Sequence, residues 1–417
     1  MPQFSRRFVA VSCTVLITLY VSRAGGVDGP TGGEAGRTVT TAEPPARLSA
    51  SAAAGAEPGS GAGSAAGPGG DTGGDGKATG DQEAADPGVM GRSGLAEVAA
   101  RVRVLAGLDI DAGQQPEGIA VEPDGSTVVT FAHTRQIARI SPAGKVRVLA
   151  TLPAPPPSAE TPAVGEPFLG GIVRAGDGTL YVTYGTGTAE LTGVWRLSPD
   201  GGGMRRIAVL PADGLPNGIA LDSRAGQLYV TDSVAGVILR VPRGGGRAVV
   251  WSSDPLLAPD PAGFAGANGI RVHRGAVWVT NHDRGTVLRF PVTGSAEAPA
   301  AGRPGTVAEG LGEIDDLEFT GDGDTLLVTG VTDSRLLLIR GRDGGGGGDR
   351  DGGGGGASAG RAVVPVLDED DGLRNPSALA RDGARMWIAN SAHYTLAEPR
   401  VLVMPVPRWA GRLTGDG

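Results

Sequence analysis

The sequence is almost free of cysteine, because Cys13 is the only one among 417 residues. It lies within residues 1–24, which have the features of an export signal, so the processed chain would contain none. A chain without cysteine has no disulfide bond, no thiolate metal ligand and no cysteine nucleophile. Any chemistry must therefore use oxygen or nitrogen side chains.

The chain has no net positive charge, and aromatic residues and helical patterning are scarce. The formal net charge is −8, and aromatic residues make up 4% of the chain. An acidic balance argues against nucleic acid or an anionic membrane as a partner. No segment keeps the apolar spacing of a helix over ten positions. Because 40% of the residues are hydrophobic, the chain can still form a core of strands.

The N-terminus has the three parts of a signal peptide. Arg6 and Arg7 precede a mostly apolar stretch from Phe8 to Val21, and Ser22-Arg23-Ala24 fits a small-x-small cleavage site. The stretch is short for a membrane span, although an uncleaved anchor is the alternative. We expect residues 1–24 to be removed, leaving no membrane contact. The protein would then be secreted or lie in the cell envelope, with the general and twin-arginine export routes both open.

Two further segments are too poor in large apolar residues to join a core. Residues 25–99 are mainly Gly, Ala, Ser, Pro and acidic residues, so we predict a disordered linker. Residues 341–360 form a Gly-rich run without the Lys-Ser/Thr pair of a phosphate cradle, so we predict a flexible loop. The folded domain then spans residues 100–408, and residues 409–417 form a tail.

One pattern of short apolar runs and turns occurs six times in this domain. Each copy has a first run such as GIAL, a tight turn, a second run such as LYVT and a third run such as GVILRV. Successive copies start 47 to 62 residues apart. A repeat of about 50 residues built from strands and turns is typical of a β-propeller. We therefore predict an all-β, six-bladed β-propeller with four-stranded blades.

The ends of the domain suggest how the ring closes. The sixth copy lacks a fourth strand, whereas an unpaired strand, RVRVLAGL at Arg101–Leu108, precedes the first copy. We expect this N-terminal strand to complete the last blade, since closure protects sheet edges. In the fourth copy the fourth strand is weak and falls on GTVAEGL, from Gly305. We also expect a monomer.

The residue just before each first run forms what we term the first ring, at one mouth of the central channel. Its members are Glu117, Gly170, Asn217, Asn268, Asp315 and Ser377. Two carboxylates and two amide oxygens among them suit a hard cation such as Ca²⁺, with Zn²⁺, Mn²⁺ and Mg²⁺ as alternatives. Asn-Gly also occurs in turns for local reasons, but turn preference does not explain Glu117. We predict Glu117, Asn217, Asn268 and Asp315 as metal ligands.

The residue just after each second run forms the second ring. Because neighbouring strands are antiparallel, we expect this ring at the same mouth. Its members are Phe131, Tyr184, Asp232, Asn281, Gly330 and Asn390. We predict that Tyr184, Asn281 and Asn390 form the wall of a substrate site and that Asp232 faces Asn217.

The stretches PEGIAV, LPNGIALDSRAGQLYVTDS and GANGIRV resemble the senescence-marker-protein/gluconolactonase family, also called regucalcin-like. The resemblance covers about residues 101–408 and implies one divalent cation on the axis of a six-bladed propeller and, in many members, lactone hydrolysis. The family's Glu corresponds to Glu117, its Asn to Asn217 and Asn268, and its Asp to Asp315, or to Asp316 if the register is one residue off. Leu215 stands where sugar-lactone members have Arg, so a sugar-acid substrate is not implied.

These residues suit hydrolysis of a small-molecule lactone or ester by water activated at a cation. Asp315 or Asp232 would accept the proton. His133, His282 and His393 lie near second-strand ends and are further acid or base candidates, whereas His273 falls at the opposite end. No G-x-S-x-G motif occurs, which argues against a serine hydrolase.

Two other functions fit the same pattern. Similar repeats occur in NHL-type propellers, in which the mouth would bind a peptide or glycan and any cation would be structural. A lyase of the strictosidine-synthase-like type also shares the scaffold. Metal analysis combined with a panel of lactones and esters would separate hydrolysis from binding.

Overall fold

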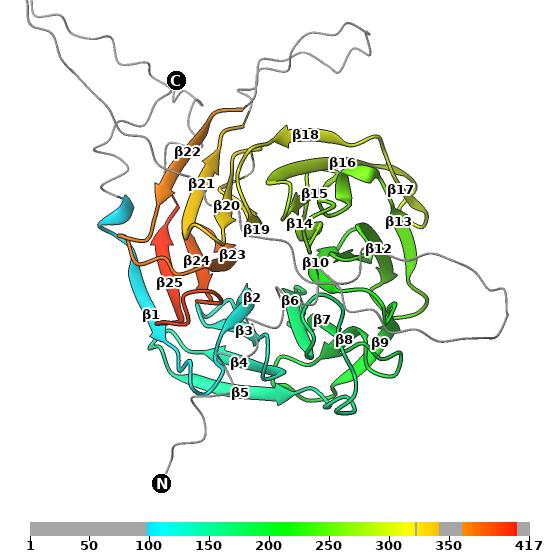
Figure 1. The fold of residues 1–417 in the computed structure, drawn as a ribbon, viewed down its shortest axis with the longest axis horizontal. Helices are drawn as coiled ribbons and strands as arrows, with labels where there is room; N and C mark the ends of the chain where they lie inside the picture. The colour runs from blue at the N-terminus through cyan, green and yellow to red at the C-terminus, as the bar shows by residue number, and fades with distance from the viewer. Residues whose placement is uncertain (1–97, 322, 342–360, 407–417) are drawn as a thin grey trace, which may run out of the picture. The chain divides into compact units, whose positions relative to one another are not determined.

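The computed structural model describes residues 98–321, 323–341 and 361–406. Six antiparallel sheets radiate from a central axis as the blades of a propeller, and the first strand of each blade lies innermost (Figure 1). This arrangement confirms the predicted six-bladed β-propeller. The predicted signal peptide, almost all of the linker, the Gly-rich run from residue 342 and the C-terminal tail lie outside the described residues.

In blades 1 to 5 the strands follow one another outward from the axis in chain order, and in blade 6 the outermost strand is the N-terminal β1. Blade 1 contains β2 (Pro116–Val121), β3 (Thr127–Phe131), β4 (Gln136–Ile140) and β5 (Val146–Thr151). Blade 2 contains β6 (Phe168–Arg174), β7 (Leu180–Gly185), β8 (Gly193–Leu197) and β9 (Arg205–Val209). Blade 3 contains β10 (Pro216–Asp222), β11 (Gln227–Asp232), β12 (Val237–Pro242) and β13 (Val249–Ser252).

The second half of the ring follows the same plan. Blade 4 contains β14 (Ala267–His273), β15 (Ala276–Asn281), β16 (Thr286–Gly294), β17 (Pro299–Ala301) and β18 (Gly305–Ala308). Blade 5 contains β19 (Ile314–Phe319), β20 (Leu326–Gly330), β21 (Arg335–Ile339) and β22 (Val363–Leu367). Blade 6 contains β23 (Pro376–Asp382), β24 (Arg385–Asn390), β25 (Arg400–Pro405) and β1 (Arg103–Gly107). A short 3-10 helix, η1 (Pro255–Leu257), precedes β14.

Blade 6 joins the two ends of the domain. β1 pairs antiparallel with β25, with Arg103 opposite Val403 and Gly107 opposite Arg400. The two strands lie side by side in Figure 1 although almost 300 residues separate them. This pairing confirms the predicted closure by the N-terminal strand, and it covers the edge that β25 would otherwise expose.

Blade 4 differs from the predicted four strands because two strands pair with the long β16. β18 pairs with Val287–Arg289 and takes the place of the predicted fourth strand, whereas β17 pairs with Val292–Gly294 beyond it. The nine residues of β16 are long enough to hold both partners along one edge. The fifth strand is therefore a local extension of a standard blade.

The Gly of the repeated GI pair allows adjacent blades to approach closely at the axis. A Cβ atom at Gly218 would lie 2.4 Å from the Asn268 carbonyl oxygen of the next blade. At Gly269 it would lie 2.6 Å from the Cα atom of Asp316. Because both distances are shorter than van der Waals contact, only Gly fits at these two positions.

The hydrophobic core lies between blades, face to face. Trp278 of blade 4 packs with Leu317 and Phe319 of blade 5, and Trp387 of blade 6 packs with Phe131 of blade 1. Trp251 of blade 3 packs likewise against strands of blade 4, within the same buried cluster as Phe290. Aromatic side chains bury large areas, so these few residues account for much of the contact between blades.

Hydroxyl groups connect neighbouring blades around the channel. Four Thr side chains of second strands donate to first-ring carbonyl oxygens of the next blade: Thr130 to Gly170, Thr183 to Asn217, Thr231 to Asn268 and Thr280 to Asp315. Ser377 of blade 6 donates to the Pro116 carbonyl of blade 1 at 2.8 Å. The backbone of the first ring is thereby fixed from the neighbouring blade.

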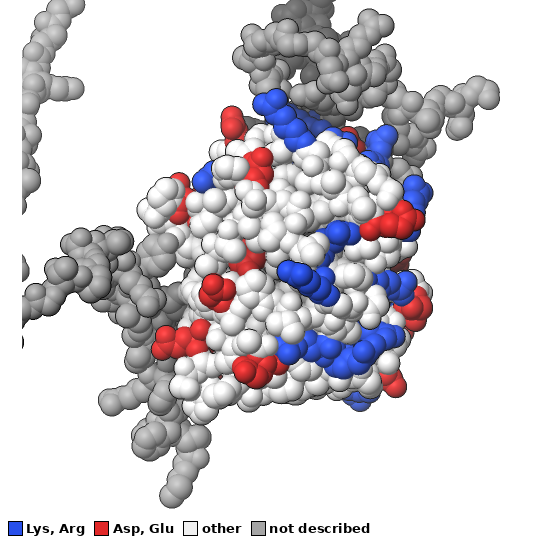
Figure 2. All heavy atoms as spheres, turned by 90° about the vertical axis from the view of Figure 1, so that its right-hand side faces the viewer, with Lys and Arg blue, Asp and Glu red and all other residues white. Residues whose placement is uncertain are grey.

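The surface carries charges of both signs. Figure 2 views the molecule from the side of β13 and β17, where Lys and Arg occur together with Asp and Glu among uncharged residues. In the part of the chain that the structure describes, no helix has the length and apolar character needed to cross a membrane.

Candidate functional site

The first ring surrounds a small cavity on the propeller axis. The cavity has a volume of about 30 Å³. Its lining includes the four predicted metal ligands, each of them less than 10% exposed: Glu117, Asn217, Asn268 and Asp315. Ser377 and Asp316 line it as well, and blade 2 contributes Gly171. The structure thus brings together side chains that are up to 260 residues apart in the sequence.

A register irregularity places these side chains at the axis. In all six blades the pairing of the first and second strands shifts near the start of the first strand, for example between Pro216 and Ile219. Such an irregularity turns the strand end and re-aims its side chains. The Thr hydroxyl then accepts the freed amide N–H, as from Gly218 to Thr231 at 2.9 Å and from Gly269 to Thr280 at 2.8 Å.

The oxygen atoms at the cavity have few partners within the described part of the chain. The side-chain oxygen of Asn268 is buried and has no hydrogen-bond partner there. No hydrogen bond to the Asp315 carboxylate or the Asn217 side chain is present among these residues either, whereas Glu117 Oε2 lies 2.8 Å from His393 Nε2. Buried polar atoms are nearly always paired in native proteins, so the unpaired Asn268 oxygen is one that a bound ion or water would satisfy.

Asp315 lies in an electrostatically unfavourable place for an anion. Burial raises its pKa well above the usual range, and the Glu117 and Asp316 carboxylates raise it further. Each of these causes penalises the charged form of Asp315. A positive ion in the cavity would relieve the penalty.

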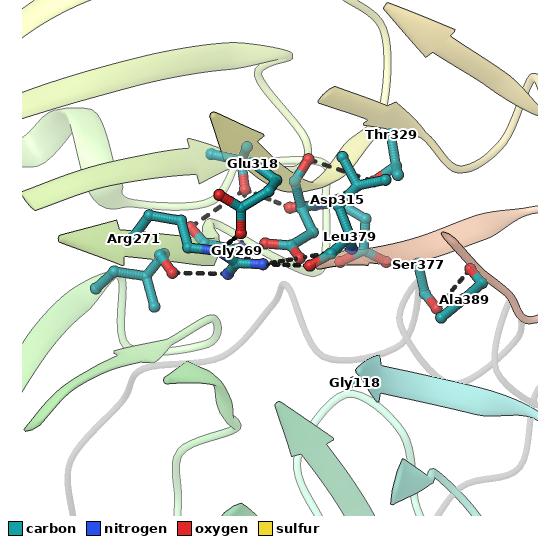
Figure 3. A network of polar contacts seen from close by, with 12 residues as sticks. Gly118, Gly269, Arg271, Asp315, Glu318, Thr329, Ser377, Leu379 and Ala389 are labelled. Atoms are coloured by element: carbon teal, nitrogen blue, oxygen red, sulfur yellow. Dashed lines mark hydrogen bonds and ion pairs between the residues drawn. The ribbon is translucent and has the colours of Figure 1, made fainter. Parts of the chain in front are cut away.

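Asp316 is already neutralised by a network that the sequence analysis did not anticipate. Arg271 forms a bidentate pair with it, Nη1 to Oδ1 at 3.0 Å and Nη2 to Oδ2 at 2.7 Å, and also donates to Glu318 at 2.9 Å. Arg271 further donates to the carbonyls of Ile270 and Leu379, and Asp316 Oδ2 accepts from the Leu379 amide at 3.0 Å. Figure 3 shows Arg271 between Glu318 and Leu379. These contacts connect blades 4, 5 and 6.

The network decides between Asp315 and Asp316 as the ligand candidate. Burial lowers the pKa of Arg271, but the two carboxylates outweigh this and raise it, so the guanidinium stays charged. Its five N–H groups are all used, and both oxygens of Asp316 are taken. Asp315, with a carboxylate free of such contacts, is the better placed donor.

The donor set fits one divalent cation. Two carboxylates and two amide oxygens are hard oxygen ligands of the kind that Ca²⁺ prefers. A cavity of about 30 Å³ exceeds the roughly 10–15 Å³ that a water molecule needs, so an ion and a water molecule fit. Among the described residues, no group of three or more His, Cys, Asp or Glu is arranged to hold a metal ion. Any cation here would therefore depend on the amide oxygens as well.

The second ring does not line this cavity. Asp232 is fully buried, and its Oδ1 accepts from the amides of Leu215 at 2.9 Å and Ala235 at 3.0 Å. Asn281 donates to the carbonyls of Leu256 and Ala258, and Asn390 accepts from Arg374 and donates to Gly372. Each of these side chains thus fixes the loop that leads into the inner strand of its own blade.

Tyr184 likewise lies in the core. Its side chain is fully buried against Trp195, and its hydroxyl donates to the Pro153 carbonyl at 2.9 Å. Burial raises the pKa of Tyr184 to about 12, so the phenol is neutral. Tyr184, Asn281 and Asn390, which we predicted as the wall of a substrate site, therefore do not line the axial cavity.

Among the four histidines, His393 contacts a predicted metal ligand and His133 lies beside it. The two rings are perpendicular, with centroids 5.8 Å apart, and His133 Nδ1 lies 2.9 Å from Glu166 Oε1. His282 is buried against Asp283 and Phe264, and His273 stacks on Phe319. The position of His393 after a second strand was a weak sequence signal, since His133 and His282 share it.

Comparisons with known proteins agree with the fold. No protein-family model matches the sequence, and no curated protein matches it. Among solved structures, a calcium-binding protein, regucalcin, from Agrobacterium tumefaciens is 14% identical, with a TM-score of 0.50 over 74% of this chain and 95% of the other. A gluconolactonase from Xanthomonas campestris is 15% identical, with a TM-score of 0.50 over 75% of this chain and 93% of the other.

A virginiamycin B lyase from Staphylococcus aureus also matches, at 16% identity and a TM-score of 0.46 over 70% of this chain and 81% of the other. Identities this low establish architecture only, because one fold serves many functions. The chain is therefore a six-bladed β-propeller of the architecture found in regucalcin and gluconolactonase.

Proposed function

We propose that this protein is an exported, metal-dependent hydrolase that opens a lactone or ester with water at the propeller axis. One observation carries the proposal: four oxygen-bearing side chains from blades 1, 3, 4 and 5 line one small cavity, and the Asn268 oxygen has no hydrogen-bond partner among the described residues. The resemblance of the repeats to lactone-hydrolysing propellers supports the reaction class, as does the shared fold with a gluconolactonase.

Glu117, Asn217, Asn268 and Asp315 would hold the cation, with Ca²⁺ as the best fit and Zn²⁺, Mn²⁺ or Mg²⁺ as alternatives. A bound divalent cation supplies Lewis acidity, which polarises a carbonyl and lowers the pKa of water. The chain's own part is to hold these oxygens in a fixed geometry. The Thr hydroxyls do this through the first-ring backbone.

Asp315 is the proton acceptor that the cavity offers. Its carboxylate would take a proton from the attacking water and return it to the leaving alcohol oxygen as the acyl carbon–oxygen bond breaks. Asp232, which we also predicted for this role, lies outside the cavity lining. Because the cavity is small and open on one side, the substrate body would extend from it into the mouth.

The substrate is a small molecule without a required carboxylate. Leu215, where sugar-lactone enzymes have Arg, is buried in an apolar cluster with Ala132 and Phe168. That position cannot bind a sugar acid by charge. We therefore expect apolar or neutral lactones and esters to be better substrates than sugar-acid lactones.

A panel of lactones and aryl esters, assayed with and without a chelator, tests the proposal. We expect hydrolysis that the chelator abolishes and that added Ca²⁺ restores. Glu117→Ala and Asp315→Ala should each lower kcat/KM by roughly 100-fold or more, because the cation contributes several kcal/mol at the transition state. Asp382→Ala, at the far end of inner strand β23, is the matched control. Hydrolysis that ignores the chelator would contradict the mechanism.

One observation favours a second function, a binding propeller with a structural cation. The cavity is small and its four candidate ligands are buried, as at a purely structural site. In that case Glu117→Ala would lower the melting temperature in Ca²⁺, while the whole panel would show no turnover with the parent protein. Binding of a peptide or glycan at the mouth would then be the activity to seek.

The proposal includes export and a monomeric state. Arg6, Arg7 and the apolar stretch after them support export. Fractionation of expressing cells should place the mature protein outside the cytoplasm, and Arg6→Lys with Arg7→Lys should block export only on the twin-arginine route. Light scattering of the purified protein measures the oligomeric state.

A further inference from the structure

Glu117 differs from the other three predicted ligands because a second side chain holds its carboxylate. His393 Nε2 lies 2.8 Å from Glu117 Oε2. The two residues come from blades 6 and 1, and both are largely buried, with side-chain exposures of 18% and 7%. An ionised carboxylate only accepts hydrogen bonds, so Nε2 must carry the proton and donate it.

The loop that carries His393 is held on several sides. Asn375 is buried, and its side-chain oxygen accepts from the amides of Tyr394 and Thr395 at 3.0 and 2.9 Å. Its side-chain nitrogen donates to the Val331 carbonyl of blade 5 at 2.9 Å. The loop bearing the histidine is therefore built into the interface between blades 5 and 6.

The backbone beside His393 is strained. Ala392 has a φ of 56°, a left-handed conformation that residues with a side chain seldom adopt. Ala392 is fully buried, and its amide donates to the Arg374 carbonyl at 2.8 Å. Strain of this kind persists only where surrounding contacts impose it, and it often occurs at functional sites.

The ring of His393 is also supported from the side. His133 of blade 1 meets it edge to face at 5.8 Å, and His133 Nδ1 lies 2.9 Å from Glu166 Oε1. The imidazole that donates to Glu117 is thus fixed by its loop and by a neighbouring ring. It has little freedom to turn away from the carboxylate.

We propose that His393 is a positioning residue for the cation site. Its Nε2–H fixes Glu117 Oε2, which leaves Oε1 as the oxygen free to bind the cation. A carboxylate held in place loses less freedom on binding an ion. This inference rests on the proposed function, since it requires that Glu117 binds a divalent cation.

Calorimetric titration of the full chain with CaCl₂, after removal of metal, tests the role. His393→Ala should weaken Ca²⁺ binding by roughly 10- to 100-fold, the range found when a residue behind a metal ligand is lost. His393→Gln keeps an N–H donor and should stay much closer to the parent. His273→Gln, a histidine at the opposite end of blade 4, is the matched control and should bind as the parent does.

The outcomes separate this inference from the proposed function. If His393→Ala binds Ca²⁺ as tightly as the parent, the positioning role is wrong while the cation site stands. If neither the parent nor any variant binds a divalent cation, both ideas fail. If His393→Gln is as weak as His393→Ala, the donor explanation is overturned, because only the shape of the ring would matter.

A measurement on the unmodified protein covers the case in which His393→Ala does not fold. The chain has four histidines, so their ring nitrogens can be assigned by NMR with one variant at a time. We expect the Nε2 nitrogen of His393 to carry a proton in the cation-free and Ca²⁺-loaded protein. A ring protonated at Nδ1 alone could not donate to Glu117, and the inference would be wrong.

Discussion

At the scale of single residues, the candidate site depends on an imbalance of charge. Arg271 neutralises Asp316, but no basic residue pairs with Asp315 among the described residues, and burial and nearby carboxylates raise its pKa. A buried charge without a partner lowers the free energy of unfolding, and a bound cation would remove this penalty. Asp315 therefore couples the stability of the domain to cation binding and to pH.

The pH dependence of the cation-free protein follows from this raised pKa. In the unfolded chain an Asp titrates near 3.8, and in the folded protein the pKa of Asp315 is higher. Between these values the folded state binds more protons, so the free energy of unfolding falls as pH rises through the interval and stays lower above it. In chelator, Asp315→Asn should be more stable than the parent at pH 7, and the difference should shrink toward pH 4.

Urea denaturation from pH 4 to pH 8, with chelator or with Ca²⁺, measures both effects. Calcium at about 100 times its Kd should raise the free energy of unfolding of the parent by about 2.7 kcal/mol and that of Asp315→Asn far less. In chelator Asp315→Asn should have the higher free energy of unfolding, and Ca²⁺ should reduce or reverse this difference. A parent protein whose stability is independent of Ca²⁺ would contradict this picture.

At the scale of the strand, the repeated VT motif has a role that its sequence does not reveal. The Thr hydroxyl bridges two blades, accepting from its own inner strand and donating to a first-ring carbonyl of the next. In blade 6 the equivalent position is Ala389, and Ser377 makes the connection to blade 1 instead. One hydroxyl thus holds the start of the inner strand in its own blade and fixes the backbone of a predicted ligand in the next blade.

Thr231→Val should destabilise the domain by about 1–3 kcal/mol, because it leaves the Asn268 carbonyl and the Gly218 amide without their partner in a buried place. The substitution keeps the shape of the side chain, so packing changes little. Thr231→Ser retains the hydroxyl and serves as the control in urea denaturation. Equal stability of the two variants would mean that the hydroxyl contributes nothing.

The first strand of each blade shows what a sequence pattern can and cannot predict. The six copies located the inner strands, although each first-ring residue lies inside its strand and not before it, and Glu117, Asn217, Asn268 and Asp315 do line one cavity. The second ring was expected at the same cavity, but Asp232 and Asn281 bond to loop backbone instead. The alternation of side chains along a strand cannot predict which way the second-ring side chains point. The pairing register shifts at the mouth, where the first strand of a blade starts beside the end of the second.

At the scale of the whole molecule, closure by β1 converts six repeats into one ring. β1 covers β25 through pairs such as Val104 with Leu402, and the two adjoin a hydrophobic cluster shared with blade 1. A ring of this kind has few exposed edges and holds the first-ring residues at fixed angles around the axis. The geometry of the cavity is thus a property of the complete circle.

Truncation tests this dependence. A chain that starts at residue 98 retains β1 and should unfold like the parent, because composition predicts no core in the segment removed. A chain that starts at residue 109 lacks β1 and exposes the length of β25, so it should melt at a lower temperature and aggregate. Calorimetry and light scattering measure both. Equal melting temperatures would show that closure adds no stability.

The sequence by itself determined the architecture, because hydrophobic alternation, turn residues and a period of about 50 residues are local properties that repeat along the chain. It also located the first ring, whose members share one position in the repeat. Only the tertiary structure decided which side chains form hydrogen bonds or ion pairs with residues around the cavity. Arg271 pairs with Asp316, and His393 bonds Glu117 across the closed ring, 276 residues apart. Such contacts depend on how the blades are arranged around the axis, and no local pattern in the chain records that arrangement.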